Sequence, residues 1–103
     1  MTTWTRVCLL GDLAPDTPRG FIVDGTAICL ARTCGEVFAV RDQCTHADVP
    51  LSEGEIDGCA IECWLHGSRF DLRTGAVLNP PASAPVTTFP VRVEADSVLV
   101  ALP

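Results

Sequence analysis

Frequent short turn-forming pairs are the feature that most constrains the fold of this sequence. Pairs of turn-forming residues recur along the chain, at Asp24-Gly25, Cys34-Gly35, Asp57-Gly58, Thr74-Gly75 and Ala95-Asp96. The runs between them are short and β-prone. No window of eleven residues shows the apolar spacing of an amphipathic helix without an interrupting Gly or Pro. The pattern therefore predicts an all-β fold of short antiparallel strands.

Nine runs are expected to be strands. They are Thr5–Leu9, Gly20–Val23, Thr26–Arg32, Val37–Arg41, Glu55–Ile56, Cys59–Cys63, Arg69–Asp71, Val91–Glu94 and Val98–Ala101. The proline-rich segment 79–85 is expected to be a stiff loop between strands, because it is too short for a linker. With 103 residues, the chain predicts a single domain spanning 1–103.

The charge balance excludes one class of partner. Thirteen acidic residues against seven basic ones give a formal charge of −6, which repels nucleic acid. The N-terminal segment lacks a basic leader followed by an apolar stretch. The longest uncharged run, 76–91, contains four prolines and cannot form a membrane helix. A cytoplasmic protein without membrane contact is expected.

Six cysteines need an explanation. In a secreted chain they would indicate disulfides, whereas in a cytosolic chain they indicate metal or redox chemistry. Only Cys44 and Cys63 have a histidine close by. Cys34 precedes a turn glycine and is expected to be exposed and prone to oxidation. The remaining three lie in strand-like runs and are expected to be buried packing residues: Cys8, Cys29 and Cys59.

The motif that carries chemistry is Cys44-x-His46 followed, after 16 residues, by Cys63-x-x-His66. Each half lies where a strand meets a turn, so its two side chains can converge on one point instead of alternating between faces. Two cysteines and two histidines suit either a tetrahedral zinc ion or a 2Fe–2S cluster. Zinc sites usually pair like with like in sequence, whereas each half here is mixed. The spacing favours the cluster, and a zinc-stapled interaction module is the alternative.

At this point the sequence resembles the Rieske family. The motif, the continuation 66–71 (HGSRFD), the Thr74-Gly75 turn and the proline loop all match, over essentially the whole chain. Length and sequence are most similar to the ferredoxins of bacterial aromatic-ring dioxygenase systems. The resemblance implies a small antiparallel β-sandwich with an inserted cluster-binding subdomain at about 42–85. It also implies one Rieske-type 2Fe–2S cluster, with the sulfur ligands on an inner iron and the imidazoles on an outer, exposed iron: Cys44, Cys63, His46 and His66.

The resemblance suggests roles for residues around the ligands. Trp64 is expected to form a partly exposed lid, and Pro80 and Pro81 to belong to a third wall over the cluster. Ser68 is either a turn former or a hydroxyl donor to a bridging sulfide, which would raise the reduction potential.

The departures from membrane-bound Rieske proteins are also informative. Val49 and Leu65 stand where those proteins carry an additional pair of cysteines, so that disulfide cannot form. Phe70 replaces a tyrosine whose hydroxyl donates to a ligand sulfur. A reduction potential at the low end of the Rieske range is therefore expected.

The implied function is soluble one-electron transfer from a reductase to a terminal aromatic-ring-hydroxylating oxygenase, by a monomer that is not itself an enzyme. Both histidines are used as ligands, so no second iron site can form and substrate oxidation must occur on another protein. A housekeeping ferredoxin for iron–sulfur cluster assembly and a redox-sensing regulator are also compatible with the motif. The acidic residues near the ligand loops are either ordinary surface or a docking patch: Asp42, Asp48, Glu53, Glu55, Asp57 and Glu62.

Overall fold

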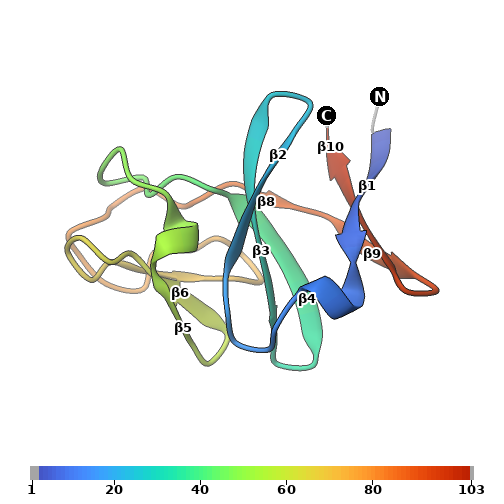
Figure 1. Ribbon diagram of the computed structural model, residues 1–103. Helices are drawn as coiled ribbons and strands as arrows, with labels where there is room; N and C mark the ends of the chain where they lie inside the picture. The colour runs from blue at the N-terminus through green and yellow to red at the C-terminus, as the bar shows by residue number, and fades with distance from the viewer. Residues whose placement is uncertain (1–2, 103) are drawn as a thin grey trace.

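The computed structural model describes residues 3–102, which form ten strands and two single 3-10 turns (Figure 1). The strands are β1 (Thr3–Leu9), β2 (Arg19–Val23), β3 (Thr26–Thr33), β4 (Glu36–Arg41), β5 (Glu55–Asp57), β6 (Ala60–Glu62), β7 (Arg69–Asp71), β8 (Thr88–Phe89), β9 (Val91–Glu94) and β10 (Ser97–Leu102). The 3-10 turns are η1 (Leu10–Asp12) and η2 (Leu51–Glu53). Within this range the fold is all-β, as the turn punctuation predicted.

The strands form three antiparallel sheets. Their orders are β1-β10-β9, β2-β3-β4-β8 and β5-β6-β7. The two-residue turns hold the hairpin registers: in the β2–β3 hairpin Val23 pairs with Thr26 around the Asp24-Gly25 turn. Both turn residues there have positive φ, 49° and 79°, which suits the twist of a tight hairpin.

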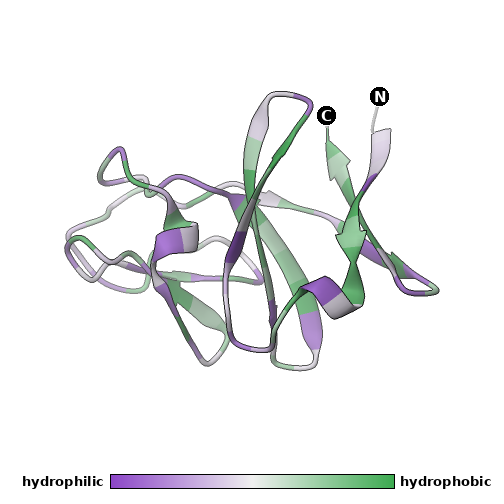
Figure 2. Ribbon diagram, in the orientation of Figure 1, coloured by the Kyte–Doolittle hydropathy of each residue, from purple (hydrophilic) through white to green (hydrophobic). Residues whose placement is uncertain are grey.

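The four-stranded sheet is buried on both faces. Along β3, Ile28 and Leu30 pack toward the β1-β10-β9 sheet, whereas Cys29 and Ala31 pack toward the β5-β6-β7 sheet and the loops around it. Successive side chains of a strand point to opposite faces, so a continuous apolar run is required here. Figure 2 shows the apolar colour along β4 and β10, with polar colour at turns such as β9–β10.

The third sheet and its loops lie at one end of the molecule, and the two termini lie at the other (Figure 1). The loop after β4, the loop after β6 and the proline loop before β8 meet at that end. No helix within residues 3–102 is long and apolar enough to cross a membrane.

Two details of the predicted strands were wrong. β8 was missed, since it contains only two residues that pair with Ala39 and Val40 of β4. The β5–β6 turn is shifted by one residue from the predicted position: it occupies Gly58 and Cys59, and Gly58 has a φ of 62°. Cys59 therefore lies in a turn and not in a strand.

Candidate metal centre

The two motif cysteines are brought together inside the protein. Cys44 and Cys63 are 2% and 1% exposed and belong to the same apolar core. Their side chains are within hydrogen-bonding reach of each other. Burial raises the pKa of the Cys63 thiol, whereas the backbone N–H groups of Leu65 and His66 lower it by donating to the sulfur. These N–H groups would stabilise a thiolate ligand in the same way.

The two motif histidines are brought together at the surface. The ring centroids of His46 and His66 lie 5.0 Å apart in an edge-to-face arrangement, and both side chains are exposed. Like residues therefore meet across the two loops: sulfur with sulfur inside, imidazole with imidazole outside. Within residues 3–102 no three Cys, His, Asp or Glu side chains gather closely enough to hold a single metal ion, so the four donors stand two and two.

Both ligand loops have the same construction. The N–H of Cys44 donates to the carbonyl of Val49 at 2.9 Å, and the N–H of Cys63 donates to the carbonyl of Ser68 at 2.8 Å. Each loop is thus closed between its cysteine and the fifth residue after it. The second loop also requires Gly67, whose φ of 77° lies in the left-handed region.

A carboxylate fixes the exit of the first loop. Asp42 accepts two hydrogen bonds at 2.7 Å, one from the N–H and one from the hydroxyl of Ser52. A Cβ on Gly20 of β2 would lie 2.7 Å from the Asp42 carboxylate. Glycine at that position therefore leaves space for the clasp between Asp42 and Ser52.

The proline loop is hydrogen-bonded to both ligand loops. The Thr45 hydroxyl donates to the carbonyl of Ala84 at 2.6 Å. The Asn79 side chain donates to the carbonyl of Gly67 and accepts from the N–H of Arg69, both at 2.9 Å. Sequence patterns did not single out Thr45 or Asn79 for this purpose. The only local signal was the Asn-Pro turn dipeptide at 79.

Ser68 is fully buried, and its hydroxyl oxygen accepts a hydrogen bond at 3.0 Å from the N–H of Ala82 in the proline loop. This bond uses a lone pair and leaves the hydroxyl proton free to donate. A buried donor on the residue whose carbonyl closes the loop of Cys63 fits a 2Fe–2S cluster, whose sulfides accept such bonds. The arrangement supports a donor role for Ser68 over a simple turn-forming role.

Exposed apolar side chains lie on the ligand loops. Trp64 is 52% exposed and Leu65 is 38% exposed. Trp64 is therefore no core aromatic, as expected. Trp4 in β1 is half-buried, and the guanidinium of Arg92 lies 4.3 Å from its ring centroid.

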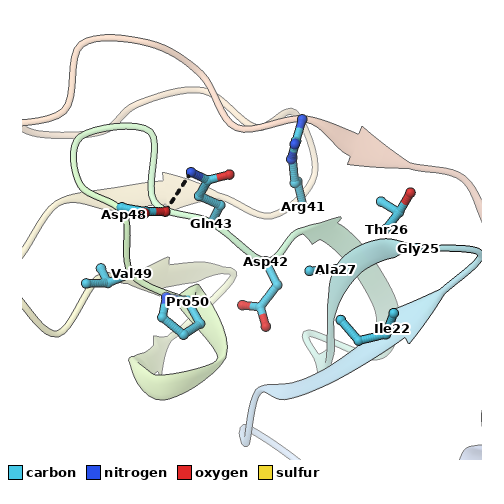
Figure 3. Close-up of a pocket in the computed structure, with 10 residues that line it drawn as sticks. All are labelled: Ile22, Gly25, Thr26, Ala27, Arg41, Asp42, Gln43, Asp48, Val49 and Pro50. Carbon is cyan, nitrogen blue, oxygen red and sulfur yellow. Dashed lines mark hydrogen bonds between the residues drawn. The ribbon is translucent and has the colours of Figure 1, made fainter.

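An open groove of about 580 Å³ separates the first ligand loop from the β2–β3 hairpin (Figure 3). Asp48 and Gln43 border it, and the Gln43 amide donates to the Asp48 carboxylate at 3.1 Å. The acidic residues near the loops therefore differ in availability. Asp42 is half-buried and accepts from Ser52, whereas Asp48 and Asp57 are both exposed and Asp57 pairs with Arg69 at 3.0 Å.

One further cysteine prediction was wrong. Cys59 was expected to be a packing residue, but it forms a disulfide with Cys34 at a Cα–Cα distance of 5.8 Å. Cys34 is exposed, as predicted. The shift of the β5–β6 turn places Cys59 beside the β3–β4 turn, which makes the bond possible. Cys8 and Cys29 are free and buried, as predicted. Burial raises the pKa of both thiols and makes them unreactive.

Comparisons with known proteins agree with this geometry. The Rieske [2Fe-2S] domain model matches residues 3–90. The biphenyl 2,3-dioxygenase ferredoxin component of Rhodococcus jostii is 43% identical over 98 residues, which cover 95% of this chain and 92% of that protein. The ferredoxin of carbazole 1,9a-dioxygenase from Nocardioides aromaticivorans has a solved structure that superposes with a TM-score of 0.91. It is 38% identical, and the match covers 95% of this chain and 96% of that one.

A second solved structure contains a partner protein. It is a complex of reduced oxygenase and oxidised ferredoxin in carbazole 1,9a-dioxygenase. The match superposes with a TM-score of 0.89 at 36% identity, over 95% of this chain and 92% of that one.

The chain belongs to the Rieske [2Fe-2S] domain family. Within that family it is a ferredoxin: it binds one 2Fe–2S cluster, transfers electrons and is not itself catalytic. The fold class predicted from the sequence is confirmed by the superposition on the Nocardioides ferredoxin.

Proposed function

We propose that the cluster is held by Cys44, His46, Cys63 and His66, with the cysteines on an inner iron and the histidines on an outer one. The observation that carries this assignment is the pairing of like residues across the two loops. The cysteines meet in the core, and the imidazole centroids lie 5.0 Å apart at the surface. A binuclear centre needs two ligands at each metal. A single zinc ion would need all four donors at one point.

The bound cluster supplies reversible one-electron chemistry. The chain supplies its surroundings. The core around Cys44 and Cys63 excludes water, and the N–H groups of Leu65 and His66 together with the Ser68 hydroxyl offer hydrogen bonds to sulfur. His46 and His66 leave one edge open, so electrons enter and leave at that edge.

The electrons are proposed to pass from a reductase to the terminal oxygenase of an aromatic-ring dioxygenase system. The ferredoxin components of biphenyl and carbazole dioxygenases support this role, since they resemble the chain over nearly its full length. The complex of an oxygenase with a related ferredoxin supports direct contact with the oxygenase. We also infer that 1–103 is one domain, with 42–85 as its cluster-binding subdomain.

Docking at the histidine edge is expected to be weak and fast. Trp64 and Leu65 offer apolar contact there, and the carboxylates of Asp48 and Glu53 add negative charge near the first loop. Electron-transfer complexes bury less than about 1,200 Å² and are steered by charge over a Debye length of about 10 Å at 0.1 M salt.

The decisive experiment has two parts. Purified protein should contain about two irons and two acid-labile sulfides per chain, because the cluster type sets that number. With a suitable reductase and oxygenase, it should then support turnover that falls with rising salt. Asp48→Asn/Glu53→Gln should slow turnover at low salt and change the potential little, with Glu94→Gln on the distant β9 as the control. Zinc in place of iron would overturn the ligand assignment. A salt-independent rate would overturn only the charged docking face.

A further inference from the structure

The Cys34–Cys59 disulfide adds a second covalent link between two parts of the molecule that are otherwise connected by the backbone and by non-covalent contacts. Cys34 lies in the β3–β4 turn of the four-stranded sheet, and Cys59 lies in the β5–β6 turn of the third sheet. Both turns lie on the lower side of Figure 1, away from the ligand loops. The bond therefore fixes the sheet that carries the second ligand loop to the four-stranded sheet.

Polar contacts surround the bond. The buried Thr33 hydroxyl lies 2.6 Å from the Asp16 carboxylate and 3.0 Å from the carbonyl of Gly58. Arg73, which follows β7, forms an ion pair with Glu36 at the start of β4. These contacts hold the two turns near each other whether or not the sulfurs are bonded, so the disulfide can open and re-form in place.

The bond is accessible from one side. Cys34 is exposed and Cys59 is half-buried. An open groove of about 480 Å³ leads to Cys34, between Pro15, Asp16 and Val37. A small thiol fits a space of this size, and access is a condition for thiol–disulfide exchange.

The segment closed by the bond carries part of the proposed cluster site. The bond spans 25 residues, and Cys44 and His46 lie between its two ends. Cys59 is also four residues before Cys63 on the same hairpin arm, and its carbonyl accepts from the N–H of Leu72 at 2.9 Å. Opening the bond removes the covalent restraint on the segment that includes the first ligand loop and leaves only non-covalent contacts between its two ends.

We propose that Cys34 and Cys59 form a reversible thiol-exchange site for low-molecular-weight thiols, and that its redox state determines how firmly the chain retains its cluster. The exchange has two steps. A thiolate attacks the Cys34 sulfur, forming a mixed disulfide and releasing Cys59, which takes up a proton. A second thiolate attacks the reagent sulfur of that mixed disulfide and releases Cys34, which takes up a proton in turn. Two thiols are oxidised to one disulfide, and the protein gains two electrons and two protons.

The consequence for the cluster rests on the proposed ligand set, whereas the exchange itself does not. Disulfides persist in oxidising surroundings and are opened where thiol buffers hold a compartment reducing. The site would therefore couple cluster retention to the thiol balance around the protein.

The first test measures exchange in the folded holoprotein. Samples are equilibrated without oxygen in buffers of varied reduced and oxidised glutathione, free thiols are trapped with N-ethylmaleimide, and peptides are analysed by mass spectrometry. The Cys34–Cys59 cross-link should open and re-form along one curve from either direction, while Cys8 and Cys29 stay unlabelled. A cross-link absent from the oxidised protein, or one that survives dithiothreitol without denaturant, would overturn the proposal.

The second test measures iron release to a chelator by loss of visible absorbance. A cross-link between residues 25 apart reduces the conformational freedom of the unfolded segment between them by a factor of up to about 300. Opening the bond should therefore accelerate release by about 10-fold to 300-fold. The Cys34→Ser/Cys59→Ser variant should release iron at the fast rate with or without glutathione, and Cys8→Ala should behave as wild type.

Two results of the second test would count against the proposal. One is unchanged release from the wild type after its cross-link has opened. The other is an equal glutathione effect in the double variant, which would mean that the thiol attacks the cluster directly. If iron is absent from the start, the ligand assignment fails, and the exchange curve of the first test still stands or falls independently.

Discussion

Replacing Ser68 by Ala should lower the reduction potential by tens of millivolts. The Ser68 hydroxyl is fully buried and accepts from the N–H of Ala82 at 3.0 Å, so its proton is directed elsewhere. In the proposed donor role this proton is bonded to a sulfide, and reduction adds one negative charge to the cluster. A hydrogen bond to a charged acceptor contributes about 1.5–3 kcal/mol, against about 0.5–1.5 kcal/mol for a neutral one. The difference, about 1–1.5 kcal/mol, favours the reduced form and is lost in Ser68→Ala.

The same difference converts directly into a potential. A tenfold change in a one-electron equilibrium corresponds to about 59 mV and about 1.4 kcal/mol. Ser68→Ala should therefore shift the potential downward by about 40–60 mV. Protein-film voltammetry at fixed pH and salt measures this shift. The wild-type value should lie near the low end of the Rieske range, closer to about −150 mV than to about +300 mV.

A control separates the lost donor from a loosened loop. Ser68→Ala also leaves the buried N–H of Ala82 without a partner, which costs about 1–3 kcal/mol of stability and loosens the proline loop. Thr45→Val removes the other hydroxyl that ties this loop, the bond to Ala84 at 2.6 Å, and leaves Ser68 in place. An unchanged potential in Ser68→Ala, or an equal shift in Thr45→Val, would refute the donor role.

Burial and close approach support three more tests, two of them with a matched control substitution. Cys44→Ser should abolish iron binding, whereas Cys29→Ser should retain iron at a packing cost of about 1 kcal/mol; iron analysis after purification distinguishes them. Gly54→Ala should lower the denaturant midpoint strongly, because its Cβ would collide with the backbone carbonyl of Glu62 in β6. Gly11→Ala, with nothing within 4 Å, should be nearly neutral. Phe70→Tyr adds a hydroxyl to a fully buried ring in the same core as the ligand cysteines, so voltammetry should show a raised potential; an unchanged or lowered value would mean that the hydroxyl finds another partner.

Local signals were sufficient to predict most of the strands. Two-residue turns fix hairpin registers, and β3 is an unbroken apolar run because both of its faces are buried. β8 could not be found in this way. Its two residues follow a proline-rich loop, and they become a strand only by pairing with Ala39 and Val40, almost fifty residues earlier in the chain.

The candidate ligands were predictable for the same local reason, since each Cys and His pair lies within one loop. The supporting bonds were not. The Thr45 hydroxyl meets a carbonyl 39 residues away, and Ser68 meets an N–H 14 residues away. The disulfide was missed for two reasons. Whether cysteines pair depends on the cellular compartment, which the residues do not encode. In addition, the β5–β6 turn was predicted one residue too early, which placed Cys59 in a strand. A shift of one residue reverses the face to which a side chain points.

The order of cysteine before histidine in both loops has a structural reason. Each loop leaves a strand, β4 or β6, and returns to close on its own cysteine by a hydrogen bond from Cys44 or Cys63. The residue that closes the loop is held at the edge of the core, and both cysteines are at most 2% exposed. The residues two or three positions later lie at the tip, where His46 and His66 are exposed. A loop of this shape therefore places the cysteine sulfur in the apolar core and the imidazole at the solvent-exposed surface. If the order were reversed, the imidazoles would be buried, the thiolates would be exposed to water and oxidation, and the edge through which a partner reaches the iron would be closed.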